Sequence, residues 1–339
     1  MLWTNEGRRT KRHRSGIIPL IALLMLSLSA GCTQSNSNQA TAPEQSPQAR
    51  EAAATPSPQP GKIKVVATFL PMYLFTKAVA GNTADVEILV PPGTEVHEYQ
   101  STPENVKAIA TANILVKNGL GLEGFLENTV KNAQNSKLSE IDASKGIQPL
   151  NEISPVEKTS KKEEEHDHEH AEGNPHVWLD PVLAKQQVAN IRDGLIAADP
   201  GNKATYESNA GAYIKQLESL DSDFKQTLQK NPNCTFITFH DAFPYLAKQY
   251  NLKQVAVVEI PEDQLAPTDV QNAVNAVKKY KVKALFSEPG VDNKLLTSLS
   301  KDLNLTLRSL DSLETGERDP QHYFKAMRDN LQTLESACK

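Results

Sequence analysis

Histidines gather in one stretch of this chain, residues 163–178, which holds four of the eight histidines in the sequence. His166, His168 and His170 alternate with acidic residues, whereas His176 lies in the run Asn-Pro-His-Val-Trp-Leu-Asp-Pro. Imidazole is the commonest protein ligand for zinc, and neighbouring carboxylates attract a dication. We interpret the first three histidines as accessory ligands in a solvated loop and His176 as a fixed ligand. An acidic loop that binds no metal is the alternative for the tract.

Three further candidate ligands stand just beyond predicted strands. They are His97 after strand 86–90, His240 after strand 235–239, and Asp311 after strand 306–310. Ligands of open parallel sheets bind outside the carboxyl ends of the strands, so these side chains can meet His176 in one cleft. Three imidazoles and one carboxylate suit a tetrahedral dication site, and zinc matches them best in softness. Taken alone, each residue also has a simpler interpretation: His97 could be a turn residue, and Asp311 could be the N-cap of a helix.

The elements that must position these ligands alternate along the chain. Short apolar runs rich in Val and Ile alternate with helical patterns both before residue 182 and after residue 232. This alternation predicts an α/β fold of two lobes, each a parallel sheet with helices on both faces. The predicted strands are 63–68, 86–90, 114–116 and 138–141, then 235–239, 254–258, 284–286 and 306–310. The predicted helices are 72–80, 103–110 and 122–133, then 244–250, 268–279, 294–303 and 320–337.

Two long helical patterns, 182–198 and 203–230, separate the lobes. Apolar residues of the second recur at spacings of three, four and seven, as an amphipathic helix requires. At about 1.5 Å per residue this helix is roughly 40 Å long, enough to join two lobes rigidly. The predicted organisation is an amino-terminal lobe at 62–181 with a His-rich loop at about 155–173, a helical linker region at 182–232, and a carboxy-terminal lobe at 233–339.

The first 61 residues have a different character. Five basic residues precede an apolar run at 17–28 and the small residues before Cys32, which predicts a secretory signal over 1–31. The run is shorter than the roughly 20 residues that span a bilayer. Cys32 resembles a bacterial lipoprotein processing site, although Ser29 stands where leucine is usual. The segment 32–61 has almost no large apolar side chain and predicts a disordered tether to a membrane anchor.

Composition limits the partners and the redox setting. The chain is 39% hydrophobic and 23% charged with a net charge of −5, and no basic stripe lies in its body, which argues against nucleic acid. We expect a monomer. If Cys32 is lipidated, Cys234 and Cys338 are the remaining thiols of the sequence. In an oxidising compartment they can form a disulfide or stay as two free, buried cysteines, and the sequence is compatible with both alternatives.

Four motifs together carry a resemblance to a known family. They are Pro-Pro-Gly-Thr-Glu-Val-His-Glu-Tyr at 91–99, Asn-Gly-Leu-Gly-Leu-Glu at 118–123, Asn-Pro-His-Val-Trp-Leu-Asp-Pro at 174–181 and Phe-His-Asp-Ala-Phe at 239–243. From about Ile63 to its end the chain resembles the cluster A-I solute-binding lipoproteins of ABC importers, in their zinc-specific, ZnuA-like branch. The resemblance implies a receptor without enzyme activity that holds metal between two lobes and delivers it to an ABC permease. It places the ligands at His97, His176, His240 and Asp311.

The resemblance also bears on the metal. Manganese-binding relatives generally carry Glu where this chain has His240, and added imidazole favours zinc over manganese. The run at 260–263 departs from the Pro-Ser-Pro-Gly-like run expected there. We expect a zinc receptor of the periplasm or cell surface; the alternatives are a manganese receptor, a secreted zinc hydrolase, and an adhesin with a structural metal. The sequence lacks the His-Glu-x-x-His motif of many zinc hydrolases.

Overall fold

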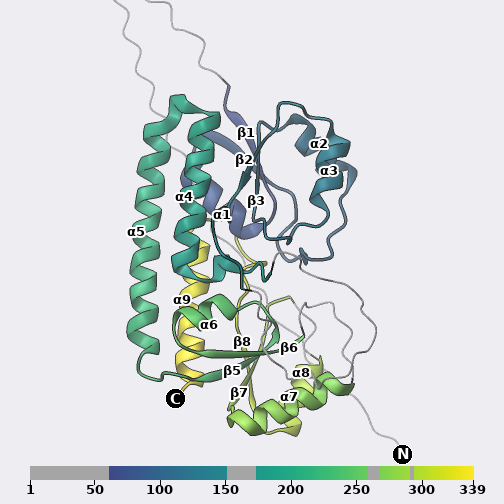
Figure 1. The fold of residues 1–339 in the computed structure, drawn as a ribbon, viewed down its shortest axis with the longest axis vertical. Coiled ribbons are helices and arrows are strands. Elements are labelled where there is room, and N and C mark those ends of the chain that lie inside the picture. The colour runs from purple at the N-terminus through teal and green to yellow at the C-terminus, as the bar shows by residue number, and fades with distance from the viewer. Residues whose placement is uncertain (1–60, 151–172, 259–266, 291–293) are drawn as a thin grey trace, which may run out of the picture. The chain divides into compact units, whose positions relative to one another are not determined.

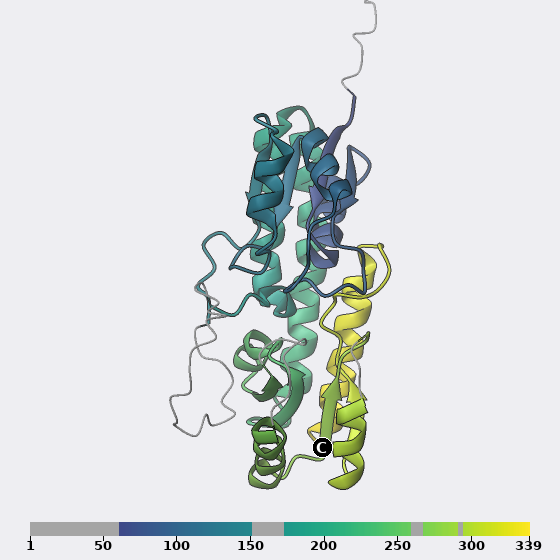
Figure 2. The ribbon, with the colours of Figure 1, turned by 90° about the vertical axis from the view of Figure 1, so that its right-hand side faces the viewer.

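A computed structural model describes residues 61–150, 173–258, 267–290 and 294–339 (Figures 1 and 2). Several sequence predictions lie outside these residues: the signal over 1–31, Cys32, the tether, the loop histidines His166, His168 and His170, and the run at 260–263. Within the described part of the chain, no helix has both the length and the apolar character needed to cross a membrane.

The amino-terminal lobe is built on a four-stranded parallel sheet. Its elements are β1 (Ile63–Ala67), α1 (Leu70–Ala80), β2 (Ala84–Ile88), α2 (Pro103–Thr111), β3 (Ile114–Lys117), α3 (Leu126–Ala133) and β4 (Ser139–Asp142). The strand order is β2-β1-β3-β4, with Val65 paired to Ile114 between β1 and β3. Both side chains are fully buried. Such strands need cover on both faces, and α1 lies on the opposite side of the sheet from α2 and α3 in Figure 1.

The carboxy-terminal lobe repeats this plan. Its elements are β5 (Thr235–His240), α6 (Pro244–Gln249), β6 (Lys253–Val258), α7 (Pro267–Tyr280), β7 (Ala284–Ser287), α8 (Lys294–Asp302), β8 (Thr306–Ser309) and α9 (Gln321–Ala337). The order β6-β5-β7-β8 is again parallel. Helices α6 and α9 lie on one side of the sheet, and α7 and α8 on the other (Figure 1). The predicted fold class is therefore confirmed.

A helical middle segment joins the two lobes. It consists of the short 3-10 helix η1 (Val177–Leu179), α4 (Pro181–Ala198), a second 3-10 turn η2 (Pro200–Asn202) and the 26-residue helix α5 (Lys203–Leu228). Helix α5 packs against α4 of the same segment, against α1 of the first lobe and against α9 of the second (Figure 1). Its buried stripe includes Tyr206, Tyr213, Leu217 and Phe224, at spacings of seven, four and seven. The predicted long connecting helix is present.

Trp178 fastens the junction between the lobes. Its indole Nε1 donates to the carbonyl of Ser312 at 2.8 Å, and its own carbonyl accepts from the hydroxyl of Tyr323 at 2.8 Å. The ring of Phe69 meets it edge-on at 4.9 Å between centroids. Trp178 is fully buried, so the segment that carries His176 is anchored to both lobes.

Many element boundaries differ from the predictions by one to four residues, and two of these differences lie in the amino-terminal lobe near the candidate ligands. Strand β2 ends at Ile88 rather than 90, although Leu89 and Val90 still donate backbone hydrogen bonds to β1 and the residue after it. Helix α3 begins at Leu126 rather than 122. Residues 119–121, just before the predicted start, all have positive φ, between 55° and 84°, and so form an irregular loop.

A disulfide joins Cys234 and Cys338, with 5.6 Å between the Cα atoms. It links the residue before β5 to the residue after α9. Of the two alternatives that the sequence left open, the structure contains the bridge, which ties the last helix of the chain to the central strand of the second sheet.

Candidate metal centre

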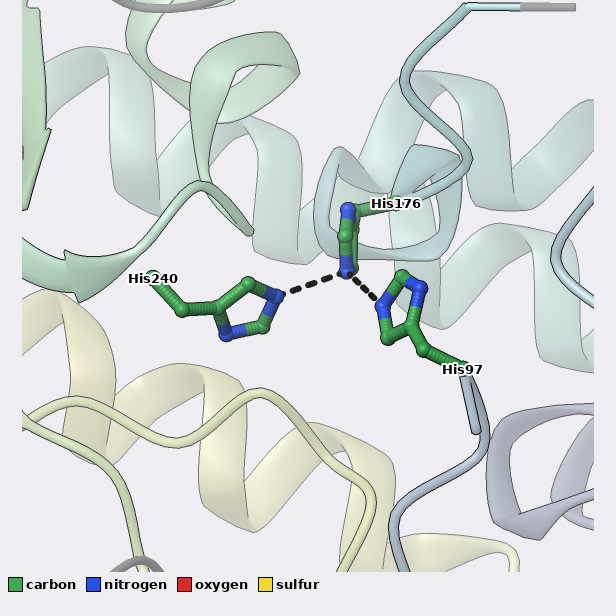
Figure 3. A group of neighbouring side chains, drawn as sticks. All are labelled: His97, His176 and His240. Atoms are coloured by element: carbon green, nitrogen blue, oxygen red, sulfur yellow. Dashed lines mark hydrogen bonds between the residues drawn. The ribbon is translucent and has the colours of Figure 1, made fainter. Parts of the chain in front are cut away.

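Three imidazoles converge between the lobes (Figure 3). His97 comes from the loop after β2, His176 from the residue before η1, and His240 is the last residue of β5. The Nε2 of His176 lies 3.2 Å from the Nε2 of His97 and 3.0 Å from the Nε2 of His240. One ligand atom from each residue lies within 4.8 Å of the others. His176 and His240 are buried and His97 is partly buried.

These spacings suit a tetrahedral zinc site. At zinc–nitrogen distances of about 2.0–2.1 Å, tetrahedral ligand nitrogens stand roughly 3.3 Å apart. The two measured separations, 3.0 and 3.2 Å, come close to that value. Among the described residues, no other group of three or more His, Cys, Asp and Glu side chains is compact enough to hold a metal ion.

The rings of His176 and His240 each face a hydrogen-bond acceptor with Nδ1, the nitrogen that points away from the centre, and this leaves the Nε2 lone pair of each ring directed toward the centre. The Nδ1 of His240 lies 2.8 Å from Oε1 of Glu288, and the Nδ1 of His176 lies 3.0 Å from Oδ1 of Asn174. Each acceptor requires a proton on Nδ1, which leaves Nε2 as a bare donor for a metal. The donor set therefore fits a zinc-like dication.

Two buried carboxyl groups, Glu288 and Glu314, and the partly buried Glu95 lie near the imidazoles. Burial raises the pKa of Glu95, although the charge of His240 opposes the rise. Burial also raises the pKa of Glu314 well above its usual value, with further contributions from the charges of Glu95 and Glu288. Burial lowers the pKa of His240, but Glu288 together with the charges of Glu95 and Asp241 offsets this, and the net shift is upward. A dication among these groups would offset their negative charge.

The structure does not bring Asp311 into the group of three imidazoles. One carboxylate oxygen of Asp311 accepts from the backbone N–H of Leu313 at 2.7 Å, which closes the turn after β8. Its backbone is fixed by Asn330, whose amide oxygen accepts from the Asp311 N–H at 2.7 Å. Burial raises the pKa of Asp311. Asp311 therefore closes a turn; the N-cap that the sequence also suggested is wrong, because the next helix, α9, begins only at Gln321.

Sequence reasoning missed the three carboxyl groups around the imidazoles. A signal existed for Glu288, because it directly follows β7, the strand beside β5. Glu95 was within the first quoted motif, two residues before His97, and Glu314 follows Asp311 by three positions. The loop histidines His166, His168 and His170 lie outside the described residues, so their relation to this centre is not described.

The Asn118–Glu123 motif shapes the loop beside the centre. The buried Glu123 carboxylate accepts from the hydroxyl of Thr68 at 2.7 Å and from the backbone N–H groups of Asn118 and Gly119 at 2.7 and 3.1 Å. The amide of Asn118 donates to the carbonyl of Pro175 at 3.1 Å. This motif therefore supports the segment that precedes His176 and contributes no ligand to the cluster.

Comparisons with known proteins agree with this geometry. Residues 65–337 match the family described as ZnuA, zinc-uptake complex component A, periplasmic. The chain is 36% identical over 286 residues to the zinc-binding lipoprotein AdcA of Streptococcus pneumoniae strain R6, a match covering 81% of this chain and 56% of AdcA. It is 34% identical over 289 residues to the high-affinity zinc uptake system protein ZnuA of Bacillus subtilis strain 168, covering 81% of this chain and 88% of that protein.

A solved structure shows the same fold. The Zn(II)-bound ZnuA-like domain of Streptococcus pneumoniae AdcA is 34% identical, with a TM-score of 0.68, and the match covers 82% of this chain and 99% of that one. The chain thus spans about half the length of the AdcA proteins it matches and nearly all of their ZnuA-like domain. The family match, the two-lobed fold and the converging imidazoles lead to one conclusion: this chain belongs to the ZnuA family of periplasmic zinc-uptake components.

Proposed function

We propose that this chain is an extracytoplasmic receptor that binds Zn²⁺ between its two lobes and delivers it to an ABC permease. The observation that carries the proposal is the convergence of His97, His176 and His240 from separate elements, at separations that suit one tetrahedral ion. The relatives named for zinc binding and zinc uptake support the same metal. The ligand set that we propose contains these three imidazoles and leaves out Asp311.

Zinc is favoured over manganese by the donor atoms. Manganese prefers carboxylate, carbonyl and water oxygens, whereas imidazole nitrogen suits zinc. His240 places a nitrogen where a carboxylate would favour manganese, and its partner Glu288 lies on the far side of the ring, at Nδ1. We therefore expect zinc to displace manganese from the site even when manganese is in large excess.

The remaining parts of the receptor follow from the sequence. Residues 1–31 direct export, Cys32 carries a lipid anchor, and residues 32–61 tether the two lobes to the membrane. His166, His168 and His170 bind zinc weakly and are accessory to the main site. We propose a monomer that acts in the periplasm or at the cell surface and has no enzyme activity of its own.

A zinc titration against a competing chelator tests the main site. The His97→Ala, His240→Ala double variant should lose the tight site, whereas His322→Ala, a matched change to a histidine outside the cluster, should keep it. Asp311→Asn retains an oxygen for the turn and should bind zinc as the unchanged chain does. Tight binding of one zinc by the double variant would refute the proposed ligands.

Two further measurements separate the alternative functions. A secreted hydrolase would turn over peptide, ester or phosphate substrates when loaded with zinc, and the receptor should turn over none. If the metal were structural, as in the adhesin alternative, the metal-free chain would be unfolded, whereas the proposed receptor should be folded and ready to bind. Uptake of isotopically labelled zinc by cells that carry the permease, with and without the receptor, tests delivery.

A further inference from the structure

Asn174 is one of the residues through which the two lobes meet, and it lies beside the proposed metal site. It lies two positions before His176, and all of its polar groups are engaged. Its amide Oδ1 accepts from the backbone N–H of His176 at 3.1 Å and faces the ring Nδ1 of the same residue at 3.0 Å. Its amide Nδ2 donates to the backbone carbonyl of Asp241 at 2.8 Å. Asp241 directly follows His240.

The backbone of Asn174 is held from the same two sides. Its N–H donates to the carbonyl of Leu150 at 2.9 Å, within the amino-terminal lobe. Its carbonyl accepts from the hydroxyl of Tyr245, a residue of α6 in the carboxy-terminal lobe. With backbone and side chain both fixed, Oδ1 has little freedom to leave the His176 ring. An acceptor held this firmly selects one tautomer of the ring.

The tautomer matters because the two forms of neutral imidazole present different atoms to the centre. With the proton on Nδ1, the Nε2 of His176 offers a lone pair toward His97 and His240. With the proton on Nε2, the same atom cannot bind metal until the proton moves or the ring turns over. The Nε2 of His176 lies within hydrogen-bond distance of the Nε2 of His97 and of His240, and it repels each of them when both atoms of a pair carry lone pairs. In the metal-free protein, a His176 ring without Oδ1 would relieve that repulsion by carrying its proton on Nε2, the wrong tautomer.

We propose that Asn174 is a positioning residue whose Oδ1, fixed by the backbone contacts of Asn174 with both lobes, holds His176 in the metal-ready tautomer before zinc arrives. Glu288 plays the corresponding part for His240 with a charged acceptor. Asn174 does so with a neutral amide, and it is held by bonds from both lobes. This inference rests on the proposed zinc-binding function and names a residue that touches no metal.

Three variants of the full chain test the inference. Asn174→Ala removes the acceptor and the donor. Asn174→Asp keeps an acceptor oxygen near Nδ1 and loses the donor to Asp241. Asn190→Ala is the matched control, because the Asn190 amide also donates to two backbone carbonyls, those of Ala143 and Lys145 in the amino-terminal lobe, and Asn190 is not a member of the imidazole cluster.

The first readout is the tautomer of His176 in metal-free protein, from two-bond ¹H–¹⁵N correlation spectra of histidine-labelled chain, assigned with a His176→Gln variant. The unchanged chain, Asn174→Asp and Asn190→Ala should show the proton on Nδ1, and Asn174→Ala should show a mixture or the Nε2 form. A proton on Nε2 in the unchanged chain would overturn the inference. So would loss of the Nδ1 form in Asn174→Asp, or its full retention in Asn174→Ala.

The second readout is zinc affinity by chelator competition at pH 8. Asn174→Ala should weaken zinc binding by about 10- to 100-fold, the usual effect of removing an outer partner of a ligand histidine. Asn190→Ala should leave the affinity unchanged even where it lowers the unfolding midpoint. Wild-type affinity in Asn174→Ala would overturn the inference. If the unchanged chain bound no zinc, the receptor proposal would fail, whereas the metal-free spectra would still decide the role of Asn174.

Discussion

Asp180 makes a defined contribution to how the stability of the metal-free protein should change with pH. It is the N-cap of α4, its Oδ1 accepts from the backbone N–H of Val182 at 2.8 Å, and its side chain is buried. Burial raises the pKa of Asp180 to about 7, against the opposing effect of that hydrogen bond. Between about pH 4 and 7 the folded chain therefore holds a proton that the unfolded chain has released. The resulting stabilisation is complete below the unfolded pKa and is lost as pH rises through about 7.

The size of the effect follows from the two pKa values. With a pKa of 3.8 in the unfolded chain and about 7 in the folded one, linkage gives about 2.7 kcal/mol at pH 5 and close to zero at pH 8. Asp180→Asn abolishes this titration and keeps the cap, because Asn is as good an N-cap as Asp. The favourable interaction of the Asp180 charge with the helix N-terminus is already contained in the folded pKa. Relative to the unchanged chain, Asp180→Asn should therefore gain about 2.7 kcal/mol between pH 5 and pH 8.

Urea unfolding of the metal-free chain at pH 5 and pH 8, in the presence of a chelator, measures this difference. Burial also raises the pKa values of other carboxyl groups, those of Glu95, Glu123, Asp311 and Glu314, but these groups are common to both proteins and cancel. Asp193→Asn, a change to an exposed carboxylate of the same helix, controls for the loss of a surface charge. An equal effect of Asp180→Asn at the two pH values would refute the reasoning.

Three other changes have defined outcomes. Replacing Cys234 and Cys338 by serine opens a loop of 104 residues and should lower the free energy of unfolding by up to about 4.7 kcal/mol, seen as the same loss when the unchanged chain is reduced. Gly194→Ala should destabilise the chain by about 1 kcal/mol despite alanine's helix preference, because the new Cβ would lie 2.5 Å from the buried side chain of Ile141; a raised unfolding midpoint would contradict this. Glu288→Gln should weaken zinc binding about 10-fold at pH 8 and move the loss of affinity to lower pH, measured by chelator competition. The shift to lower pH is expected because burial lowers the pKa of His240, and the Glu288 carboxylate that opposes this effect is lost in the variant. An unchanged affinity and pH profile would exclude the role given to Glu288.

The sequence predicted the element types well because the two lobes are built from regular alternation. Strands buried on both faces appear as short runs of Val and Ile, and the amphipathic stripe of α5 appears at spacings of three and four. The boundaries moved where the backbone took conformations that side-chain patterns do not report, as at Leu120, whose φ is +55°. The disulfide could not be predicted, because only the packing of α9 decides that Cys338 returns to the start of β5.

The candidate site shows what strand-end reasoning can and cannot supply. The rule that ligands bind beyond the carboxyl ends of parallel strands places residues at one edge of a sheet. It does not say where along that edge each residue lies, because that position depends on the strand order. In the second lobe the order is β6-β5-β7-β8, so the residue after β7 neighbours the end of β5, whereas the end of β8 is two strands away, roughly 10 Å. Glu288 follows β7 and contacts His240 at 2.8 Å; Asp311 follows β8 and closes its own turn.

The same argument explains why three histidines from distant parts of the chain were predictable and their partners were not. His97, His176 and His240 are rare residues whose chemistry singles them out before any strand order is known. Carboxylates are common, and several stand near strand ends, so chemistry alone cannot choose among them. The choice is made by which strand lies beside β5 and by the turns that follow each strand. A zinc receptor can therefore be predicted from its imidazoles, but the charges that tune its affinity and pH dependence must be taken from its fold.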